Sequence, residues 1–173
     1  MTHSTFTVHP SPVGDVLLVT TDAGLVCTEV LPDDDDRGID QQLAALSRTL
    51  GETPGRDDAG ADGARRQLDE YFDGRRRAFD LVLDWRLVAG FARDALQQVC
   101  EIPYGQTAGY GEVAIMAGHA GAARAVGNAC ARSPFSIVVP VHRVVHADGS
   151  IGGYGSRIEV KRYLLDLERT DGE

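Results

Sequence analysis

From Val88 onward the sequence changes from a pattern with several short β-prone runs to one of helical segments alone. Before this point, short β-prone runs alternate with Ser, Pro and Gly, as expected for hairpins, at Phe6–Val8, Val16–Thr20 and Gly24–Val30. After it, helical segments are separated by glycine or proline. The 173 residues suffice for two small domains. We therefore expect an α+β protein that divides into residues 1–87 and 88–173.

The N-terminal part is expected to form a small antiparallel sheet with helices beside it. Helical spacing marks Gln41–Leu50 and Ala64–Phe72, and a further strand is expected at Ala78–Leu83. The segment Gly51–Gly63 is rich in Gly, Asp and Pro and is therefore predicted to be a loop. The acidic run Asp33–Asp36 is interpreted as a solvated loop, because four adjacent carboxylates cannot converge on one metal ion in regular structure.

The C-terminal part is expected to be helical. The segments with helical spacing are Phe91–Cys100, Gly111–Ala117, Ala122–Ala131 and Val160–Glu168. The second and third are joined by Gly118-His119-Ala120, a short connection that contains glycine. These two helices are therefore predicted to form a helix-turn-helix.

Charge is unevenly distributed along the chain. The whole sequence has a formal net charge of −9, which by itself argues against binding to nucleic acid. Residues 1–100 hold 10 basic and 18 acidic side chains, whereas residues 103–165 hold 6 basic and 3 acidic ones. A surface that binds nucleic acid is therefore compatible with the C-terminal part.

Cysteine usage and hydropathy are typical of a reduced cytoplasmic protein. The three cysteines, Cys27, Cys100 and Cys130, show no paired spacing of the kind that forms disulfides or zinc sites. No apolar run reaches the roughly 20 residues that span a bilayer, and the first residues lack the pattern of a signal peptide. We expect a cytoplasmic protein with no membrane partner, no metal and no cofactor.

Several short blocks in the second half of the chain occur in a fixed order. They are Ile102–Thr107, Tyr110–Ala114, Gly121–Gly127, Pro140–Val145 and Gly152–Gly155. In content and spacing they resemble the O6-alkylguanine-DNA alkyltransferases, and the resemblance extends over nearly the whole chain. It implies an RNase H-like N-terminal sheet with a helix, followed by an alkyltransferase DNA-binding domain with a helix-turn-helix.

The resemblance also implies how the chain would meet double-stranded DNA. The helix Ala122–Ala131 would lie in the minor groove, and Arg124 would fill the space that an extruded nucleotide leaves in the base stack. Tyr110 would press on the 3′ phosphate of that nucleotide. The other implied DNA contacts are Ala123, Gly127 and Arg132, and the implied base pocket consists of Val141, His142, Val144, Tyr154, Gly155 and Ser133.

The residue that performs the chemistry in this family is missing. The family carries a nucleophilic cysteine between the proline and the histidine of the block Pro140–Val145, and Val141 stands at this position. His142 and Glu168 match the histidine that takes the proton from the thiol and the glutamate that orients this histidine. They remain either as a relay without a nucleophile or as a structural pair, and no catalytic residue is expected.

Other side chains offer no replacement for the cysteine. Cys130 has no neighbouring histidine and no helix N-terminus to lower its pKa, so we do not expect it to act as the nucleophile. A metal site is not expected either, because metal-ligand spacing is absent from the histidines His119, His142 and His146.

Three further positions depart from the family pattern. Ser133 stands where an asparagine usually braces the turn below the active site, and serine can cap fewer backbone groups. The segment Phe91–Leu96 differs from the family's first helix, and Arg157 replaces a small residue. The pocket is therefore expected to differ in shape as well as in reactivity.

Three functions agree with these features. The first is a non-catalytic, alkyltransferase-like monomer that binds double-stranded DNA containing O6-alkylguanine, flips the damaged base out of the stack and signals repair, with an excision-repair protein as a further partner. The second is an alkyltransferase whose cysteine has been replaced by Val141. The third is the same fold recruited to bind or transform a small molecule with His142 and Glu168, which the acidic net charge favours.

Overall fold

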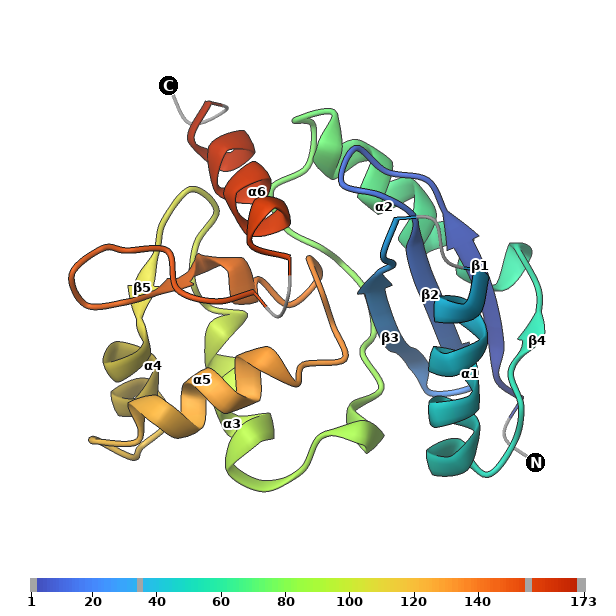
Figure 1. Ribbon diagram of the computed structural model, residues 1–173, viewed down its shortest axis with the longest axis horizontal. Helices are drawn as coiled ribbons and strands as arrows, with labels where there is room; N and C mark the ends of the chain where they lie inside the picture. The colour runs from blue at the N-terminus through green and yellow to red at the C-terminus, as the bar shows by residue number, and fades with distance from the viewer. Residues whose placement is uncertain (1–2, 34–35, 155–156, 171–173) are drawn as a thin grey trace. The chain divides into compact units, whose positions relative to one another are not determined.

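The computed structural model describes residues 3–33, 36–154 and 157–170. It divides into two compact units, Met1–Leu87 and Val88–Glu173 (Figure 1). Asp34 and Asp35 of the acidic run, and Gly155 of the expected base pocket, lie outside the described residues. Asp36, at the end of the acidic run, is the first residue of a helix.

The first unit contains a four-stranded sheet with the order β3-β2-β1-β4. β1 (Thr5–His9), β2 (Val16–Thr21) and β3 (Gly24–Val30) pair antiparallel, close to the positions that the sequence predicts. β4 (Gly55–Arg56) pairs in parallel with β1, because backbone amides of the segment predicted to be a loop bond to carbonyls along the edge of β1. The sheet is therefore mixed rather than purely antiparallel.

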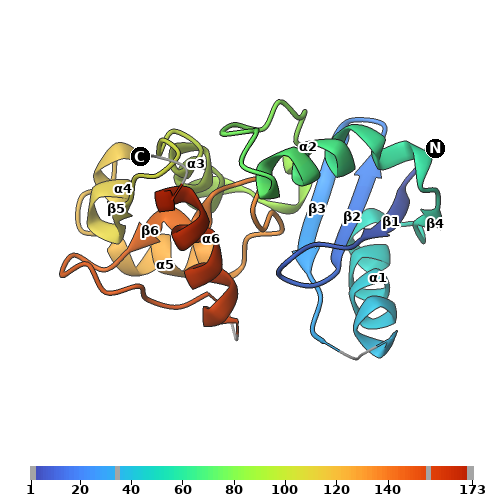
Figure 2. The ribbon, with the colours of Figure 1, turned by 90° about the horizontal axis from the view of Figure 1, so that it is seen from above.

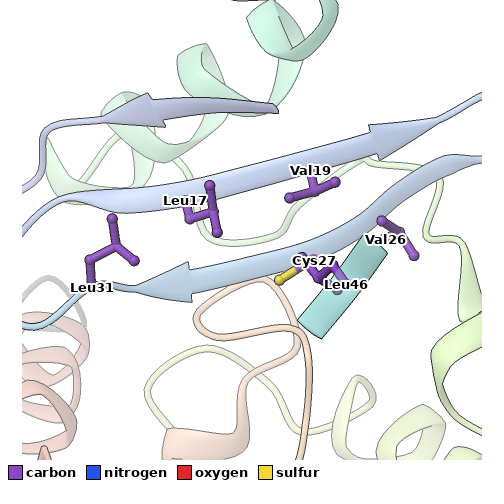
Figure 3. Close-up of a cluster of buried hydrophobic side chains, with 6 residues drawn as sticks. All are labelled: Leu17, Val19, Val26, Cys27, Leu31 and Leu46. Carbon is purple, nitrogen blue, oxygen red and sulfur yellow. The ribbon is translucent and has the colours of Figure 1, made fainter. Parts of the chain in front are cut away.

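Helices cover both faces of this sheet (Figure 2). α1 (Asp36–Leu50) packs on one face, where Figure 3 shows a cluster of buried side chains: Leu17, Val19, Val26, Cys27, Leu31 and Leu46. α2 (Asp62–Phe72) lies against the other face, and its Asp69 contacts His9 of β1. Residues 16–19 of β2 are fully buried because both faces of this strand are covered, and the strand is accordingly a continuous apolar run.

Residues 78–83, all within the described part of the chain, do not form the expected strand. The side chain of Gln67 binds both the amide and the carbonyl of Asp80, at 2.8 and 2.9 Å. It thereby satisfies backbone groups that a sheet ladder would otherwise use. Leu83 forms an isolated bridge with Leu25 of β3, so the segment touches the sheet without joining it as a strand.

The second unit is built mainly from helices. α3 (Gly90–Val99), α4 (Tyr110–Met116), α5 (Ala123–Ala131) and α6 (Ile158–Thr170) lie close to the segments that the sequence predicts to be helical. α4 is followed by Gly118 at φ +82°, a left-handed conformation that ends helices and favours glycine. Apolar side chains with at most 1% exposure form the interior: Leu96, Val99, Val113, Val126, Phe135, Val139, Val144 and Leu164.

A two-residue parallel pair, for which the sequence has no signal, links distant parts of this unit. β5 (Ala108–Gly109) pairs with β6 (Val144–Val145). β5 leads directly into α4, and β6 directly follows the 3₁₀ turn Val141–Arg143. The pairing therefore holds the first residue of α4 beside the block Pro140–Val145.

These elements make the fold mixed α+β, as the sequence predicts. The first unit combines a sheet with flanking helices, and the second is helical apart from its short strand pair and 3₁₀ turn. Among the helices of the described residues, none has both the length and the apolar composition needed to cross a membrane.

Candidate functional site

Val141 is buried in the turn that follows Pro140. Its side chain is 6% exposed, and the turn is closed by a backbone hydrogen bond from Arg143 to the carbonyl of Pro140. Valine carries only a branched hydrocarbon, so it can neither lose a proton nor attack an electrophile. Burial of such a side chain stabilises the fold by roughly 1.5–3 kcal/mol. At this position the chain therefore has a buried apolar side chain that cannot react.

His142, next to Val141, is fully buried and bonded to Glu168 of α6. Its Nε2 lies 2.8 Å from Glu168 Oε1, and neither side chain exceeds 1% exposure. Burial lowers the pKa of His142, against the opposing effect of the Glu168 hydrogen bond and charge. A neutral imidazole that donates from Nε2 keeps Nδ1 as an acceptor, and Nδ1 has no hydrogen-bond partner in the part of the chain that the structure describes.

Glu168 also binds Arg143 through a bidentate contact. Arg143 donates from Nε to Oε2 at 2.9 Å and from Nη2 to Oε1 at 2.8 Å, while its Nη1 donates to the carbonyl of Ile102 at 2.7 Å. The amide of Gly105 adds a longer contact to Glu168, at 3.3 Å. Burial alone would raise the pKa of Glu168, but the hydrogen bonds from His142 and Arg143 outweigh it and lower the pKa to about 2. Glu168 is therefore ionised at neutral pH, with Arg143 as its counter-charge.

The chain enters this block through a strained turn. Ile137 has φ +70°, and a left-handed conformation costs a non-glycine residue roughly 1–2 kcal/mol. The amides of Val138 and Val141 bond to the carbonyls two residues before them, both at 2.7 Å. Ser133 supports the start of this turn, since its Oγ accepts a hydrogen bond from the amide of Phe135 at 3.1 Å. Strain of this kind is typical of functional sites, and no feature of the sequence marks Ile137 in advance.

Tyr110 begins α4 and is half-buried among residues of other segments. The centre of its ring lies 5.3 Å from that of His146, and a side chain at Gly127 in α5 would meet the ring at 3.8 Å. The Nζ of Lys161 lies 6.0 Å from the centre of the same ring. Burial raises the pKa of Tyr110, so its phenol stays protonated at neutral pH.

Lys161 belongs to this site, although the sequence does not single it out. It has 0% exposure in α6, and its Nζ donates to the carbonyls of Val144 at 2.6 Å and Gly153 at 3.3 Å. Burial lowers the pKa of Lys161 to about 8. The side chain thus fastens the backbone at Gly153 to β6. A lysine on an amphipathic helix carries no signal of this role, because most such lysines face water.

The helix expected to meet DNA presents basic and small residues. Arg124 and Arg132 are exposed, and neither side chain makes a hydrogen bond or ion pair with any described residue. Ala123 and Gly127 are half-buried on the same helix. A guanidinium that is free within the protein can bind a ligand without breaking an internal contact.

Two further residues of the expected base pocket, Val144 and Tyr154, lie in β6 and in the chain that follows it. Val144 is fully buried in β6, and burial raises the pKa of Tyr154 to about 12. Arg157, the expected departure from a small residue, pairs with Glu159 at 2.6 Å at the start of α6. Arg157 is therefore engaged near the surface rather than in the interior.

No activated thiol is present among the cysteines, all of which lie in described residues. Loss of hydration raises the pKa of each, to about 12 for the buried Cys27 and the partly buried Cys130 and to about 11 for Cys100, which is exposed. These thiols therefore stay protonated at neutral pH. Over residues 3–33, 36–154 and 157–170, no group of three or more His, Cys, Asp or Glu side chains could hold a metal ion.

Comparison with known proteins agrees with this fold and shows the family of the chain. The family model for the DNA-binding domain of 6-O-methylguanine DNA methyltransferase matches residues 90–170, which include Val141 and the contacts of Glu168. Residues 90–170 thus correspond to the DNA-binding domain of the 6-O-methylguanine DNA methyltransferases. The chain is also 43% identical over 108 residues to a methylated-DNA–protein-cysteine methyltransferase of Methanosarcina barkeri, covering 62% of this chain and 68% of that protein. It belongs to the methylated-DNA–protein-cysteine methyltransferase family.

Solved structures extend the similarity to both units. The crystal structure of the Mycobacterium tuberculosis O6-methylguanine methyltransferase matches with a TM-score of 0.79 at 35% identity, covering 100% of this chain and 96% of that one. A crystal structure of the M. tuberculosis protein OGT in complex with DNA matches with a TM-score of 0.78 at 34% identity, covering 98% and 94%. The whole described chain therefore has the alkyltransferase fold.

Proposed function

We propose that this protein recognises O6-alkylguanine in double-stranded DNA without removing the alkyl group. The observation that carries the proposal is Val141, a buried hydrocarbon at the position where the family has its cysteine. Loss of hydration raises the pKa of the three cysteines that the chain does have, so a thiolate is disfavoured at each of them. Alkyl transfer by the family's chemistry is therefore lost, and binding remains.

The network around the missing nucleophile supports a pocket that still binds. His142, Arg143 and Glu168 form closely spaced buried contacts, and such a network fixes the shape of the turn that carries Val141. The unpaired Nδ1 of His142 costs roughly 1–3 kcal/mol of stability unless a partner arrives. A ligand or water that donates a hydrogen bond there would remove this cost.

The surface of α5 supports contact with a duplex. Its half-buried small residues permit close approach, and Arg124 is exposed and free of internal partners in the described chain. A planar cation suits the space left in a base stack, because it can both stack and donate hydrogen bonds. The similar M. tuberculosis protein has been crystallised with DNA, which is consistent with this role for the fold.

Selectivity for the lesion follows from the energy of extruding a base. Extrusion costs a few kcal/mol and is least costly where pairing is already weakened, as it is at an alkylated guanine. The apolar side chain of Val141 would then face the alkyl group instead of reacting with it. In this proposal the monomeric protein marks the lesion, and an excision-repair protein completes the repair.

Fluorescence anisotropy with two duplexes that differ in a single O6-methylguanine tests the proposal. We expect tighter binding to the lesion duplex, an affinity that falls as salt rises, and no methyl group on the protein by mass spectrometry. Equal affinities for the two duplexes, or a protein heavier by one methyl group, would contradict it.

A second candidate is an alkyltransferase in which valine has replaced the nucleophile. The contacts of His142 and Glu168 favour it, because a thiolate at position 141 would depend on the same pair. Restoring the cysteine tests whether the surrounding site is still competent for transfer. Only a site that has kept the full geometry for transfer would then accept an alkyl group.

A further inference from the structure

One ring nitrogen of His142 is a buried hydrogen-bond acceptor. The side chain has 0% exposure, and its Nε2 is bonded to Glu168 at 2.8 Å. Burial lowers the pKa of His142 and so favours the neutral ring. A neutral imidazole that donates from Nε2 has only a lone pair at Nδ1, so this atom can accept a hydrogen bond and cannot donate one. Nδ1 has no hydrogen-bond partner among the described residues, and a group that donates to it would remove the cost of an unpaired buried acceptor.

This acceptor belongs to the same short turn as Val141. Both residues lie in the 3₁₀ turn Val141–Arg143, and the side chain of Val141 is 6% exposed. In the proposed function the alkyl group of the lesion faces Val141. A polar atom at the far end of that alkyl group would then meet the residues beside Val141, and His142 directly follows it. The turn thus combines an apolar side chain with a hydrogen-bond acceptor.

The buried cations near this turn are already engaged. Arg143 donates from Nε and Nη2 to Glu168 and from Nη1 to a backbone carbonyl. Lys161 donates to two backbone carbonyls. Glu168, whose pKa is lowered to about 2, adds a negative charge beside His142. These contacts disfavour an anionic substituent on the guanine, because a buried anion needs a counter-charge or donors that are not already used.

We propose that the pocket prefers guanine that carries an O6-hydroxyalkyl group, whose terminal hydroxyl donates a hydrogen bond to His142 Nδ1. The inference rests on the proposed function and names the class of lesion that it recognises. A site with a buried acceptor discriminates against an analogue that lacks the matching donor, because the acceptor is then left unpaired. An ionised substituent such as carboxymethyl has no proton to donate, and its lone pairs would face the lone pair of Nδ1.

Duplexes that differ only in the O6 substituent of a single guanine test this preference. The substituents are propyl, hydroxyethyl and carboxymethyl, and an undamaged duplex is the reference. Propyl and hydroxyethyl have the same number of non-hydrogen atoms and differ in the terminal hydroxyl. In anisotropy titrations at neutral pH, we expect wild type to bind the hydroxyethyl duplex at least about fivefold more tightly than the propyl duplex. The carboxymethyl duplex should bind more weakly than the propyl duplex.

His142→Phe removes the acceptor and keeps a planar ring. Glu168 retains its bidentate partner Arg143 in this variant, and thermal unfolding verifies that the protein is folded. We expect the preference for hydroxyethyl over propyl to disappear, because an apolar ring favours the apolar chain. His3→Phe makes the same change at an exposed histidine of the other unit and should keep the wild-type preference.

A second measurement uses wild type alone and does not depend on the folding of a variant. A nitrogen that accepts a hydrogen bond changes its electronic environment, which nitrogen NMR of the histidine rings detects. The Nδ1 signal of His142 should move further on adding the hydroxyethyl duplex than on adding the propyl duplex. Equal movements would contradict the proposed hydrogen bond.

The outcomes keep this inference separate from the proposed function. If the hydroxyethyl and propyl duplexes bind equally, but both more tightly than the undamaged duplex, the preference is wrong although lesion recognition stands. If folded His142→Phe keeps the wild-type preference, His142 is not the acceptor. If none of the lesion duplexes binds more tightly than the undamaged duplex, the proposed function fails and this inference fails with it.

Discussion

At the scale of single residues, the side chain at position 141 determines whether this turn can carry a nucleophile. Valine and cysteine are both small and buried readily, so the turn can keep its shape while its reactivity is lost. The neighbouring His142 could accept a proton from a thiol. Burial lowers its pKa and so favours the neutral ring, and its Nδ1 has no hydrogen-bond partner among the described residues. A valine in place of the family's cysteine therefore needs no rearrangement of the backbone.

Val141→Cys should restore a reactive thiol if the surrounding geometry is intact. His142 is the neighbouring base that could take the proton, and Glu168 is ionised and would stabilise the resulting imidazolium. Incubation with a duplex containing O6-methylguanine should then add one methyl group to the protein, as read by mass spectrometry. Val141→Ser is the control of similar size and should gain nothing. A folded Val141→Cys that stays unmodified would show that the site has diverged beyond this residue.

Glu168→Gln should destabilise the second unit strongly. The substitution leaves the buried guanidinium of Arg143 without its counter-charge, and breaking a buried pair from one side costs about 3–5 kcal/mol. Denaturant unfolding measures the change. Glu159→Gln on the same helix breaks only an ion pair with Arg157 in which Glu159 is exposed, and should cost at most about 1 kcal/mol. Equal effects of the two variants would mean that the network contributes little to stability.

Sequence reasoning reaches some of these residues and misses others for a physical reason. His142 and Glu168 are named through the family pattern, and the structure places them in contact. The second partner of Glu168, Arg143, and the clamp formed by Lys161 are not foreseen. In a sequence, a buried cation looks the same as a solvated one, since only the tertiary fold determines which carbonyls lie within its reach.

At the scale of elements, the second unit joins a helix pair to a buried turn. α5 carries the exposed Arg124, and α4 begins with Tyr110 next to β5. The helices are predictable from the spacing of their apolar residues, and the longer strands from β-prone runs bounded by turn residues. The expected strand at Ala78–Leu83 is wrong, and β4, β5 and β6 are missed, because pairs of two residues depend on distant partners rather than on a local pattern.

Arg124→Ala should weaken binding to the lesion duplex by roughly 1–3 kcal/mol, about five- to a hundred-fold in the dissociation constant. The substitution removes a free, exposed guanidinium without breaking an internal contact in the described chain, so unfolding stability should barely change. Arg162→Ala, also exposed but on α6, serves as the charge-matched control. Equal affinities of the two variants would argue that α5 does not meet the duplex as proposed.

At the scale of the whole molecule, stability should fall in acid because of one buried group. The folded protein lowers the pKa of Glu168 from 4.5 to about 2. A lowered carboxyl pKa stabilises the fold above the unfolded value, and this contribution is lost as the pH falls from about 4.5 to 2. The loss is on the order of 3 kcal/mol. Denaturant unfolding across this range should show it in wild type and much less in Glu168→Gln, and parallel curves would contradict the assignment.

The short pair of β5 and β6 connects the residue expected at the phosphate with the turn that carries Val141. β5 passes without interruption into Tyr110, and β6 follows Arg143 without interruption. The residue expected at the phosphate and the receptacle expected for the base are therefore coupled through a few peptide units. If a duplex binds as proposed, a shift at the phosphate contact would therefore be transmitted to the base site through this strand pair.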